Sequence, residues 1–281
     1  MQDAAAHFPQ YTFISALTPS AHKAAFHVKD ANGDDLCLKL VSPNYERERL
    51  DREILAMQKI VHPNVVRLIE YTFSSKSGQQ LHYIVEEFVE GKDLAEHLQS
   101  GKPWDLPRAV TFFAQMCDGL AALKAQDIVH RDIKPHNVRV RATGQPVIID
   151  FGLARHLTLP DLTQTVLGAR IGTPAYFAPE QFDGNKYDID HRTDLFAVGI
   201  LMYEALTGSP PFLTSATTTI AELRDAVCSG SKHLVTPEFR ALDKNVRLIV
   251  TKLLEKDRSR RPADAGQLAG ILRKLGGGVA P

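Results

Sequence analysis

The chain is poor in cysteine and has no excess of either charge, and each shortage argues against a class of protein. Its three cysteines, Cys37, Cys117 and Cys228, lack the short spacing of metal-ligand pairs, so we expect reduced, buried thiols in a cytoplasmic protein. Lysine and arginine together number 33, as do aspartate and glutamate, so the formal net charge is zero. A broad nucleic-acid-binding surface needs a basic excess, and we therefore expect no nucleic-acid partner.

The sequence also lacks the apolar segments that signal peptides and membrane helices require. Residues 1–10 contain neither a basic region nor an apolar one, which argues against a signal peptide. The longest apolar stretch, near residues 195–206, is shorter than the roughly 20 residues that cross a bilayer. We therefore expect a cytoplasmic chain without a membrane span.

The first third of the chain has the pattern of a β-sheet. An apolar run at residues 36–41 follows a turn signal, and two further strand-like segments, residues 65–73 and 82–88, are joined by a predicted turn over residues 74–78. A charged helix is predicted over residues 45–61, because a His-Pro-Asn breaker follows it.

The remainder of the chain has the pattern of helices. Residues 107–124 carry an amphipathic stripe, and the chain beyond Asp194 is predicted to be helical. We therefore predict an α+β fold of two lobes. A small β-rich lobe with one helix covers residues 1–88, and a larger helical lobe covers residues 89–275. Residues 276–281 are expected to form a flexible tail.

Lys39 stands inside the apolar run of the first predicted strand. A buried ammonium is costly unless an anion pairs with it. In the predicted helix, Glu53 falls on the same stripe as the apolar residues that face inward. We therefore predict a pair between Lys39 and Glu53; alternatively, Lys39 reaches solvent and Glu53 lies at a rim.

Three short motifs follow in the second part of the chain. Residues 130–137 read His-Arg-Asp-Ile-Lys-Pro-His-Asn, residues 150–152 read Asp-Phe-Gly after an apolar strand, and residues 178–180 read Ala-Pro-Glu. Their order and spacing resemble the signature set of protein kinases, in particular the eukaryotic-like (Hanks-type) Ser/Thr protein kinases of bacteria. The resemblance extends over about residues 10–275, nearly the whole chain.

The resemblance implies an enzyme that transfers the γ-phosphoryl group of ATP to Ser or Thr hydroxyls of a protein, with Mg²⁺ as cofactor. It implies that Asp132 orients the attacking hydroxyl and that Lys134 contacts the transferring phosphoryl group. Asn137 and Asp150 are the implied Mg²⁺ ligands, since their side-chain oxygens suit that ion.

For the nucleotide, the resemblance implies that Lys39 holds the α- and β-phosphates while Glu53 holds Lys39, both as members of the catalytic set. The implied ATP-binding residues are Lys39, Glu87, Val89, Ala25, Cys37, Ser20, Arg139 and Asp150. Two positions near the adenine are unusual: Glu86 occupies the gatekeeper position, and Arg139 stands where the family has an aliphatic residue beneath the ring. The stem of Arg139 can pack there while its head points outward.

Residues 150–180 correspond to the activation loop of the family. The resemblance implies that Thr173 lies at the substrate-docking position and that Thr163 and Thr165 are autophosphorylation sites, with self-association as the route. It also implies that Arg131 receives a loop phosphate through charge-assisted hydrogen bonds. Alternatively, these threonines are ordinary solvated loop residues.

Glycine is absent where the family has its glycine-rich phosphate loop. No glycine precedes Gly33, and the corresponding residues 14–26 include Pro19. Side chains and a proline restrict the backbone, so the phosphates have to be covered in another way, by donors from Ser20 or by the charge of Lys23.

Three functions are therefore compared. The complete catalytic set favours an active Ser/Thr protein kinase, whereas the missing glycines favour a pseudokinase that acts as a nucleotide-binding scaffold or sensor. A kinase-fold enzyme for small molecules is disfavoured by the Ala-Pro-Glu segment and by Thr173-Pro174, which in the family form a peptide-docking platform. Mg²⁺-dependent turnover would distinguish an active protein kinase from a pseudokinase. Transfer to a protein acceptor would distinguish it from an enzyme that acts on small molecules.

Two contacts of the large lobe are also predicted from the resemblance. Asp194 is expected to accept hydrogen bonds from the backbone of the His-Arg-Asp segment. Glu180 is expected to form a buried pair with Arg261. Both contacts are expected to be architectural and to take no direct part in the chemistry.

Overall fold

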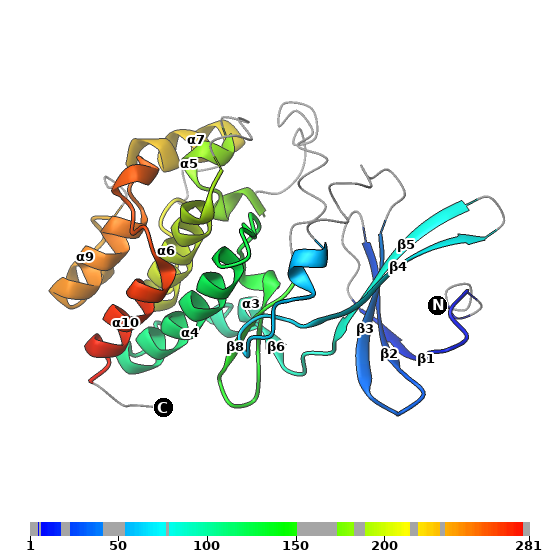
Figure 1. Cartoon of the computed structure of the whole chain (residues 1–281). Coiled ribbons are helices and arrows are strands. Elements are labelled where there is room, and N and C mark those ends of the chain that lie inside the picture. The colour runs from blue at the N-terminus through cyan, green and yellow to red at the C-terminus, as the bar shows by residue number, and fades with distance from the viewer. Residues whose placement is uncertain are drawn as a thin grey trace. The chain divides into compact units, whose positions relative to one another are not determined.

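The computed structural model describes residues 5, 7–17, 23–41, 54–76, 79–150, 173–182, 189–213, 219–230 and 234–277. The chain divides into two compact units, Met1–Glu90 and Gly91–Pro281 (Figure 1). The first unit contains an antiparallel sheet and the second is mainly helical. The α+β fold class predicted from the sequence is therefore confirmed.

The sheet of the first unit has five strands in the order β1-β2-β3-β5-β4, and all neighbours are antiparallel. Its strands are β1 (Thr12–Ala16), β2 (Lys23–Lys29), β3 (Asp35–Val41), β4 (Leu68–Lys76) and β5 (Gln79–Glu87). The predicted turn over residues 74–78 was wrong for residues 74–76. These residues belong to β4, because the ladder continues through Ser75↔Gln80 to Lys76↔Gln79.

One face of this sheet forms a hydrophobic core. The register pairs Phe26 with Leu38 and Leu38 with Val85, so these side chains lie on the same face. All three are buried, and Phe8 joins them from the segment before β1, with its ring 4.7 Å from that of Tyr83. The burial of this face fixes the register, since a slip of one residue would expose the whole set.

The opposite face carries the residues that the sequence associated with the nucleotide. Ala25 pairs with Lys39, and Lys39 pairs with Ile84. Cys37 pairs with Glu86 two positions along, so it shares this face. The alternation of side chains along β2, β3 and β5 therefore separates a packed face from a face with polar groups.

The predicted helix is described from residue 54 onward, where it ends at Met57 and not at Val61. The reason is local, since the N–H groups of Lys59 and Ile60 donate to the carbonyls of Ala56 and Met57, three residues earlier. Such bonds tighten and terminate a helix.

The second unit consists of helices and a small antiparallel sheet of order β6-β7-β8. The strands are β6 (Lys92–Asp93), β7 (Val138–Val140) and β8 (Pro146–Ile148). The α-helices are α3 (Leu94–Leu98), α4 (Leu106–Lys124), α5 (Pro179–Phe182), α6 (His191–Thr207), α7 (Ile220–Ser229), α8 (Pro237–Ala241), α9 (Lys244–Leu253) and α10 (Ala265–Leu275). The described part of this unit also contains the 3-10 turns η1 (Pro135–Asn137), η3 (Thr173–Tyr176) and η6 (Arg258–Arg260).

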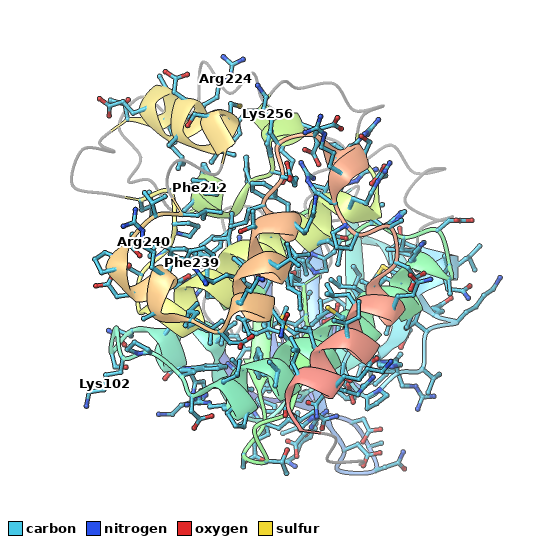
Figure 2. The ribbon with its side chains drawn as sticks, turned by 90° about the vertical axis from the view of Figure 1, so that its left-hand side faces the viewer. Lys102, Phe212, Arg224, Phe239, Arg240 and Lys256 are labelled. Carbon is cyan, nitrogen blue, oxygen red and sulfur yellow. The ribbon has the colours of Figure 1, made fainter. Side chains whose placement is uncertain are left out.

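Helix α6 forms the core of the second unit, where it packs against α4 and α9 (Figure 1). It is apolar around most of its circumference and is buried along nearly its whole length. Phe212 stacks on Phe196 with the ring centroids 6.0 Å apart, and Phe239 stacks on Tyr203 at 5.1 Å. Figure 2 shows Arg224 of α7, by contrast, projecting away from the ribbon. The buried helix α6 therefore provides a fixed base for the loops that contact it.

Both ends of α6 are fixed by their sequence. The Asp190 carboxylate accepts a hydrogen bond from the Arg192 N–H at 2.8 Å, which caps the first turn. Gly208 ends the helix with φ of +85°, and a Cβ at this position would overlap the carbonyl oxygen of Gly101. Within the described ranges, no helix combines the length and the apolar character needed to cross a membrane.

Candidate active site

The loop between α4 and β7 contains the His-Arg-Asp motif and is anchored to α6 by Asp194. The two carboxylate oxygens of Asp194 accept hydrogen bonds from the N–H groups of His130 and Arg131, each at 2.8 Å. Arg131 has φ of +65°, and these bonds hold that unfavourable backbone conformation. The predicted contact of Asp194 is therefore confirmed. Burial raises the pKa of Asp194 to about 7, against the opposing effect of the two N–H donors and of Arg131.

The His130 ring links this loop to the strand that precedes Asp150. Its Nδ1 accepts a hydrogen bond from the Asp132 N–H at 3.3 Å, so the ring proton is on Nε2. Nε2 then donates to the Ile149 carbonyl at 3.1 Å. The side chain is buried, and the two bonds hold the backbones of Asp132 and Ile149 in one arrangement.

Asp132 lies at the centre of a cluster of three polar side chains. Its Oδ2 accepts hydrogen bonds from Lys134 Nζ and from Asn137 Nδ2, both at 2.9 Å. Asn137 Nδ2 also donates to the Asp132 carbonyl at 2.8 Å. The side chains of Asp132 and Lys134 are 15% and 19% exposed, so a substrate can reach them while their positions are restricted. The structure therefore brings together three of the predicted catalytic residues.

Asn137 and Asp150, the predicted Mg²⁺ ligands, belong to neighbouring backbone segments. The Ile149 N–H donates to the Asn137 carbonyl at 2.9 Å, so the residue before Asp150 lies beside Asn137. Asp150 itself has φ of +59°, an uncommon conformation for a residue with a Cβ. The amide nitrogen of Asn137 donates hydrogen bonds to Asp132, so the Oδ1 atom of Asn137 points away from that contact. A carboxylate and an amide oxygen are hard ligands that fit Mg²⁺.

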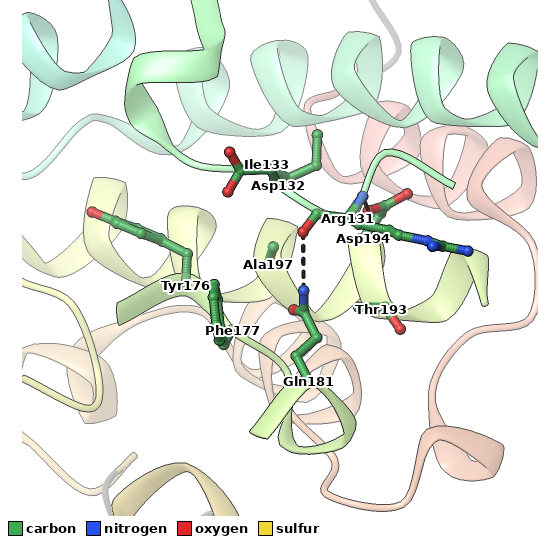
Figure 3. A pocket seen from close by; sticks show the side chains of 9 residues that line it. All are labelled: Arg131, Asp132, Ile133, Tyr176, Phe177, Gln181, Thr193, Asp194 and Ala197. Atoms are coloured by element: carbon green, nitrogen blue, oxygen red, sulfur yellow. Dashed lines mark hydrogen bonds between the residues drawn. The ribbon is translucent and has the colours of Figure 1, made fainter. Parts of the chain in front are cut away.

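A pocket lies between this loop and the segment of η3 and α5, and residues of both line it (Figure 3). The Gln181 side chain donates to the Arg131 carbonyl at 2.9 Å and accepts from the Ala178 N–H at the same distance. Tyr176, also in the pocket lining, donates its hydroxyl hydrogen to Glu204 of α6 at 2.9 Å. The sequence reasoning missed Gln181, although it follows the Ala-Pro-Glu motif directly.

The end of this segment is held by the predicted pair of Glu180 and Arg261. Arg261 Nη1 and Nη2 lie 2.7 and 2.8 Å from the two oxygens of Glu180, and Thr193 donates to one of them at 2.7 Å. Both residues are buried. Burial by itself would raise the pKa of Glu180, but the Arg261 guanidinium and the Thr193 hydroxyl hold that pKa below its ordinary value. The pair predicted from the sequence is confirmed.

In the first unit, Lys39 has a carboxylate partner that the sequence reasoning did not assign to it. Its Nζ lies 2.6 Å from Glu86 Oε2, and the two side chains are 9% and 4% exposed. Glu53, the predicted partner, lies outside the described residues. The register explains the contact, since Cys37 pairs with Glu86 and Lys39 lies two residues further along the same face of β3.

Three other predicted nucleotide-binding residues of the first unit, Ala25, Cys37 and Glu87, belong to strands of the same sheet. Cys37 is buried, and so is Val89, which follows β5. The Glu87 N–H donates to the Arg67 carbonyl at 2.9 Å, and the Glu87 side chain accepts from the Arg67 N–H at 3.3 Å. Glu87, the last residue of β5, is thereby tied through its backbone and its side chain to Arg67, just before β4.

Arg139, which the family resemblance placed beneath the adenine ring, points its head toward β6. Its Nη1 donates to Asp93 Oδ1 at 2.8 Å, and its Nη2 donates to the Gly91 carbonyl oxygen. β6 pairs with β7 so that Asp93 lies opposite Arg139. The guanidinium is thus bound within the small sheet of the second unit, which leaves only the aliphatic stem for the predicted packing.

Several predicted residues fall outside the described parts of the chain. They are Ser20, Glu53, Thr163 and Thr165, as well as the side chain of Thr173, whose backbone begins η3. Their predicted roles stay predictions.

Comparison with known proteins identifies the family. The protein kinase domain family matches residues 23–270. The chain belongs to the protein kinase domain family. Among its relatives, this kinase domain is 37% identical over 235 residues to serine/threonine-protein kinase pkn2 of Myxococcus xanthus, covering 80% of the chain and 27% of that protein. It is 30% identical over 256 residues to serine/threonine-protein kinase PknB of Mycolicibacterium smegmatis, covering 88% of the chain and 40% of that protein.

The kinase domain therefore spans between about a quarter and two fifths of the length of these relatives. Protein kinases in general use ATP and Mg²⁺ and act on protein substrates. The motifs that carried the resemblance in the sequence lie within the matched residues.

Proposed function

We propose that this chain is the catalytic domain of a Ser/Thr protein kinase, which transfers the γ-phosphoryl group of ATP to a protein hydroxyl. The observation that carries the proposal is the placement of Lys134 and Asn137 around the Asp132 carboxylate, each 2.9 Å from the same oxygen. The names of the relatives, which are Ser/Thr kinases, and the lysine two residues after Asp132 support Ser/Thr specificity.

The residues of the chain would act mainly by positioning and by charge. Asp132 accepts a hydrogen bond from the attacking hydroxyl and orients it toward the phosphorus, as the reaction makes little covalent demand on the protein. Lys134, already bound to Asp132, places a positive charge beside the transferring group. Asn137 and Asp150 would hold Mg²⁺, which neutralises charge on the phosphates when it is bound. Lys39 would hold the α- and β-phosphates.

The loop between β1 and β2 would cover the phosphates without glycine. Residues 12–29 contain no glycine, so close backbone approach is restricted there. We assign the covering role to the hydroxyl and backbone donors of Ser20 and to the charge of Lys23. The missing glycines are the feature that favours a pseudokinase, whereas Lys39, Asp132, Lys134, Asn137 and Asp150, which are all present, favour an active kinase. Neither the described structure nor the relatives add support for the pseudokinase.

Autophosphorylation at Thr163 or Thr165 is the finer part of the proposal. Arg131 lies next to the catalytic aspartate and has a guanidinium that can bind a phosphate with two hydrogen bonds. This contact between Arg131 and a phosphate on the activation loop would order the loop. Self-association of two copies is the expected route to this autophosphorylation.

The acceptor of the phosphoryl group tests the proposal. The purified chain is incubated with γ-labelled ATP and Mg²⁺, alone and with a general protein acceptor, and the labelled amino acids are identified by mass spectrometry. We expect phosphoserine and phosphothreonine, with Thr163 or Thr165 among the sites. Label on tyrosine alone, or no label on any protein by a folded chain that binds ATP, would overturn the proposal.

A further inference from the structure

We propose that Glu86 is a positioning residue for Lys39, which holds the lysine ammonium from within the sheet. The inference rests on the proposed function, in which Lys39 binds the nucleotide phosphates. It assigns to the sheet a task that the sequence reasoning gave to Glu53 of the predicted helix.

The first observation is the geometry of the pair. Lys39 Nζ and Glu86 Oε2 are 2.6 Å apart, within the range of a strong charge-assisted hydrogen bond. The two residues belong to β3 and β5, which are adjacent and paired continuously from Leu36↔Glu87 to Val41↔His82. Lys39 and Glu86 are diagonal neighbours on one face of this ladder, so their separation is fixed by the backbone register.

The second observation is burial. Lys39 is 7% exposed and Glu86 is 3% exposed. A charge in such surroundings loses most of its hydration, and removing one partner of a buried pair leaves the other uncompensated. A carboxylate at this position therefore compensates the charge of the lysine and restricts its side chain to a small set of rotamers.

The third point is that the bond to Glu86 is compatible with phosphate binding. An ammonium group has three N–H donors, so a lysine that donates to one carboxylate can also donate to phosphate oxygens. Glu86 would thus act as a support and not as a competitor. The nucleotide would bind a lysine that is already oriented, which lowers the entropic cost of binding.

Both partners are strand residues, so the support that Glu86 gives to Lys39 comes from the sheet itself. We therefore expect nucleotide binding to depend on the Glu86 carboxylate.

The test measures the affinity for Mg·ADP by calorimetry, together with melting temperature and the KM for Mg·ATP. The variants are Glu86→Gln, Glu86→Asp and Lys39→Met, with the double variant Lys39→Met/Glu86→Gln. Glu86→Gln is expected to weaken Mg·ADP binding by about tenfold or more, because it removes the charge while keeping the shape. Glu86→Asp, which keeps the charge, should recover at least part of that loss. In the Lys39→Met background, Glu86→Gln should have no further effect on affinity.

A structural role alone would give a different pattern. If Glu86→Gln and Glu86→Asp lower the melting temperature but leave the Mg·ADP affinity and KM unchanged, Glu86 is not a positioning residue. Should Glu86→Gln fail to fold, Glu86→Asp decides the question. Binding of Mg·ADP does not require phosphoryl transfer, so the two proposals can fail separately. If the wild type transfers phosphate and the Glu86 variants bind Mg·ADP as tightly as it does, only this inference is refuted. If Mg·ADP binding depends on Glu86 but the wild type transfers no phosphate, only the proposed function is refuted. A folded wild type that does not bind Mg·ADP refutes both.

Discussion

Arg261 and Glu180, 81 residues apart in the sequence, form a bidentate ion pair beneath the peptide segment that follows the activation loop. The Arg261 side chain is fully buried, and the guanidinium also donates to the carbonyls of Glu255 and Lys256 at 2.8 and 3.0 Å. One arginine thus joins α5 to the chain before α10. The pair is linked to the lining of the pocket through Thr193, whose hydroxyl donates to Glu180.

Replacing Arg261 by Ala is expected to destabilise the domain by about 3–5 kcal/mol, because it leaves the buried Glu180 carboxylate uncompensated. Urea unfolding measures the change. Arg260→Ala serves as the matched control, since the Arg260 side chain is 69% exposed and its ion pair with Asp257 is long, at 4.0 Å. The control is expected to cost no more than about 1 kcal/mol. Equal effects of the two substitutions would contradict the importance of the buried pair.

Asp194→Asn tests the anchor of the catalytic loop. The N–H groups of His130 and Arg131 bind different oxygens of Asp194, and asparagine replaces one of these oxygens with an NH₂ group, which cannot accept. One of the two bonds is therefore lost, and phosphoryl transfer should fall by at least about tenfold. The raised pKa of Asp194 also predicts a pH dependence. Between the ordinary value of 3.8 and about 7, the folded wild type binds a proton that the unfolded chain does not.

The stability advantage of wild type over Asp194→Asn should therefore be greatest below about pH 4 and should decrease as the pH rises through about 7. Unfolding free energies of the two proteins at a series of pH values measure this difference. Other titrating groups are common to both proteins and cancel to a first approximation. An advantage that stays constant over this range, or that increases with pH, would contradict the raised pKa.

Gly208→Ala tests the close approach of α6 to the chain at Gly101. The substitution places a Cβ where the Gly101 carbonyl oxygen lies, in addition to the cost of φ at +85°. We expect a loss of more than about 2 kcal/mol in the free energy of unfolding. Gly144→Ala is the control, since Gly144 has φ of +84° with nothing within 4 Å of the added Cβ. The control should cost only the conformational term, about 1 kcal/mol, and equal losses would show that the close approach is unimportant.

The sequence was most informative where the determining interactions are local. Helix α4 begins one residue from the predicted start, because Asp105 caps it with a hydrogen bond from the Arg108 N–H at 2.8 Å and its apolar residues recur with the helical period. The contacts of Asp194 and the Glu180–Arg261 pair followed from motif positions. The partner of Lys39 was missed because Glu86 is 47 residues away in the sequence. The two residues meet only through the pairing of β3 with β5, which no local pattern determines. The guanidinium contacts of Arg139 depend in the same way on the pairing of β6 with β7.

The most direct test of the account compares phosphoryl transfer by the wild type with that by Asp132→Asn. Asp127→Asn is the matched control, since Asp127 is exposed and undergoes the same chemical change five residues earlier. Transfer of label from γ-labelled ATP to a general protein acceptor is followed with Mg²⁺ present, on samples shown to be folded and to bind Mg·ADP. We expect Asp132→Asn to lower the rate by about 10²–10⁴-fold while Asp127→Asn stays within about twofold of wild type. A rate for Asp132→Asn equal to that of the control would contradict the role of Asp132, and with it the assignment of this loop as the catalytic centre.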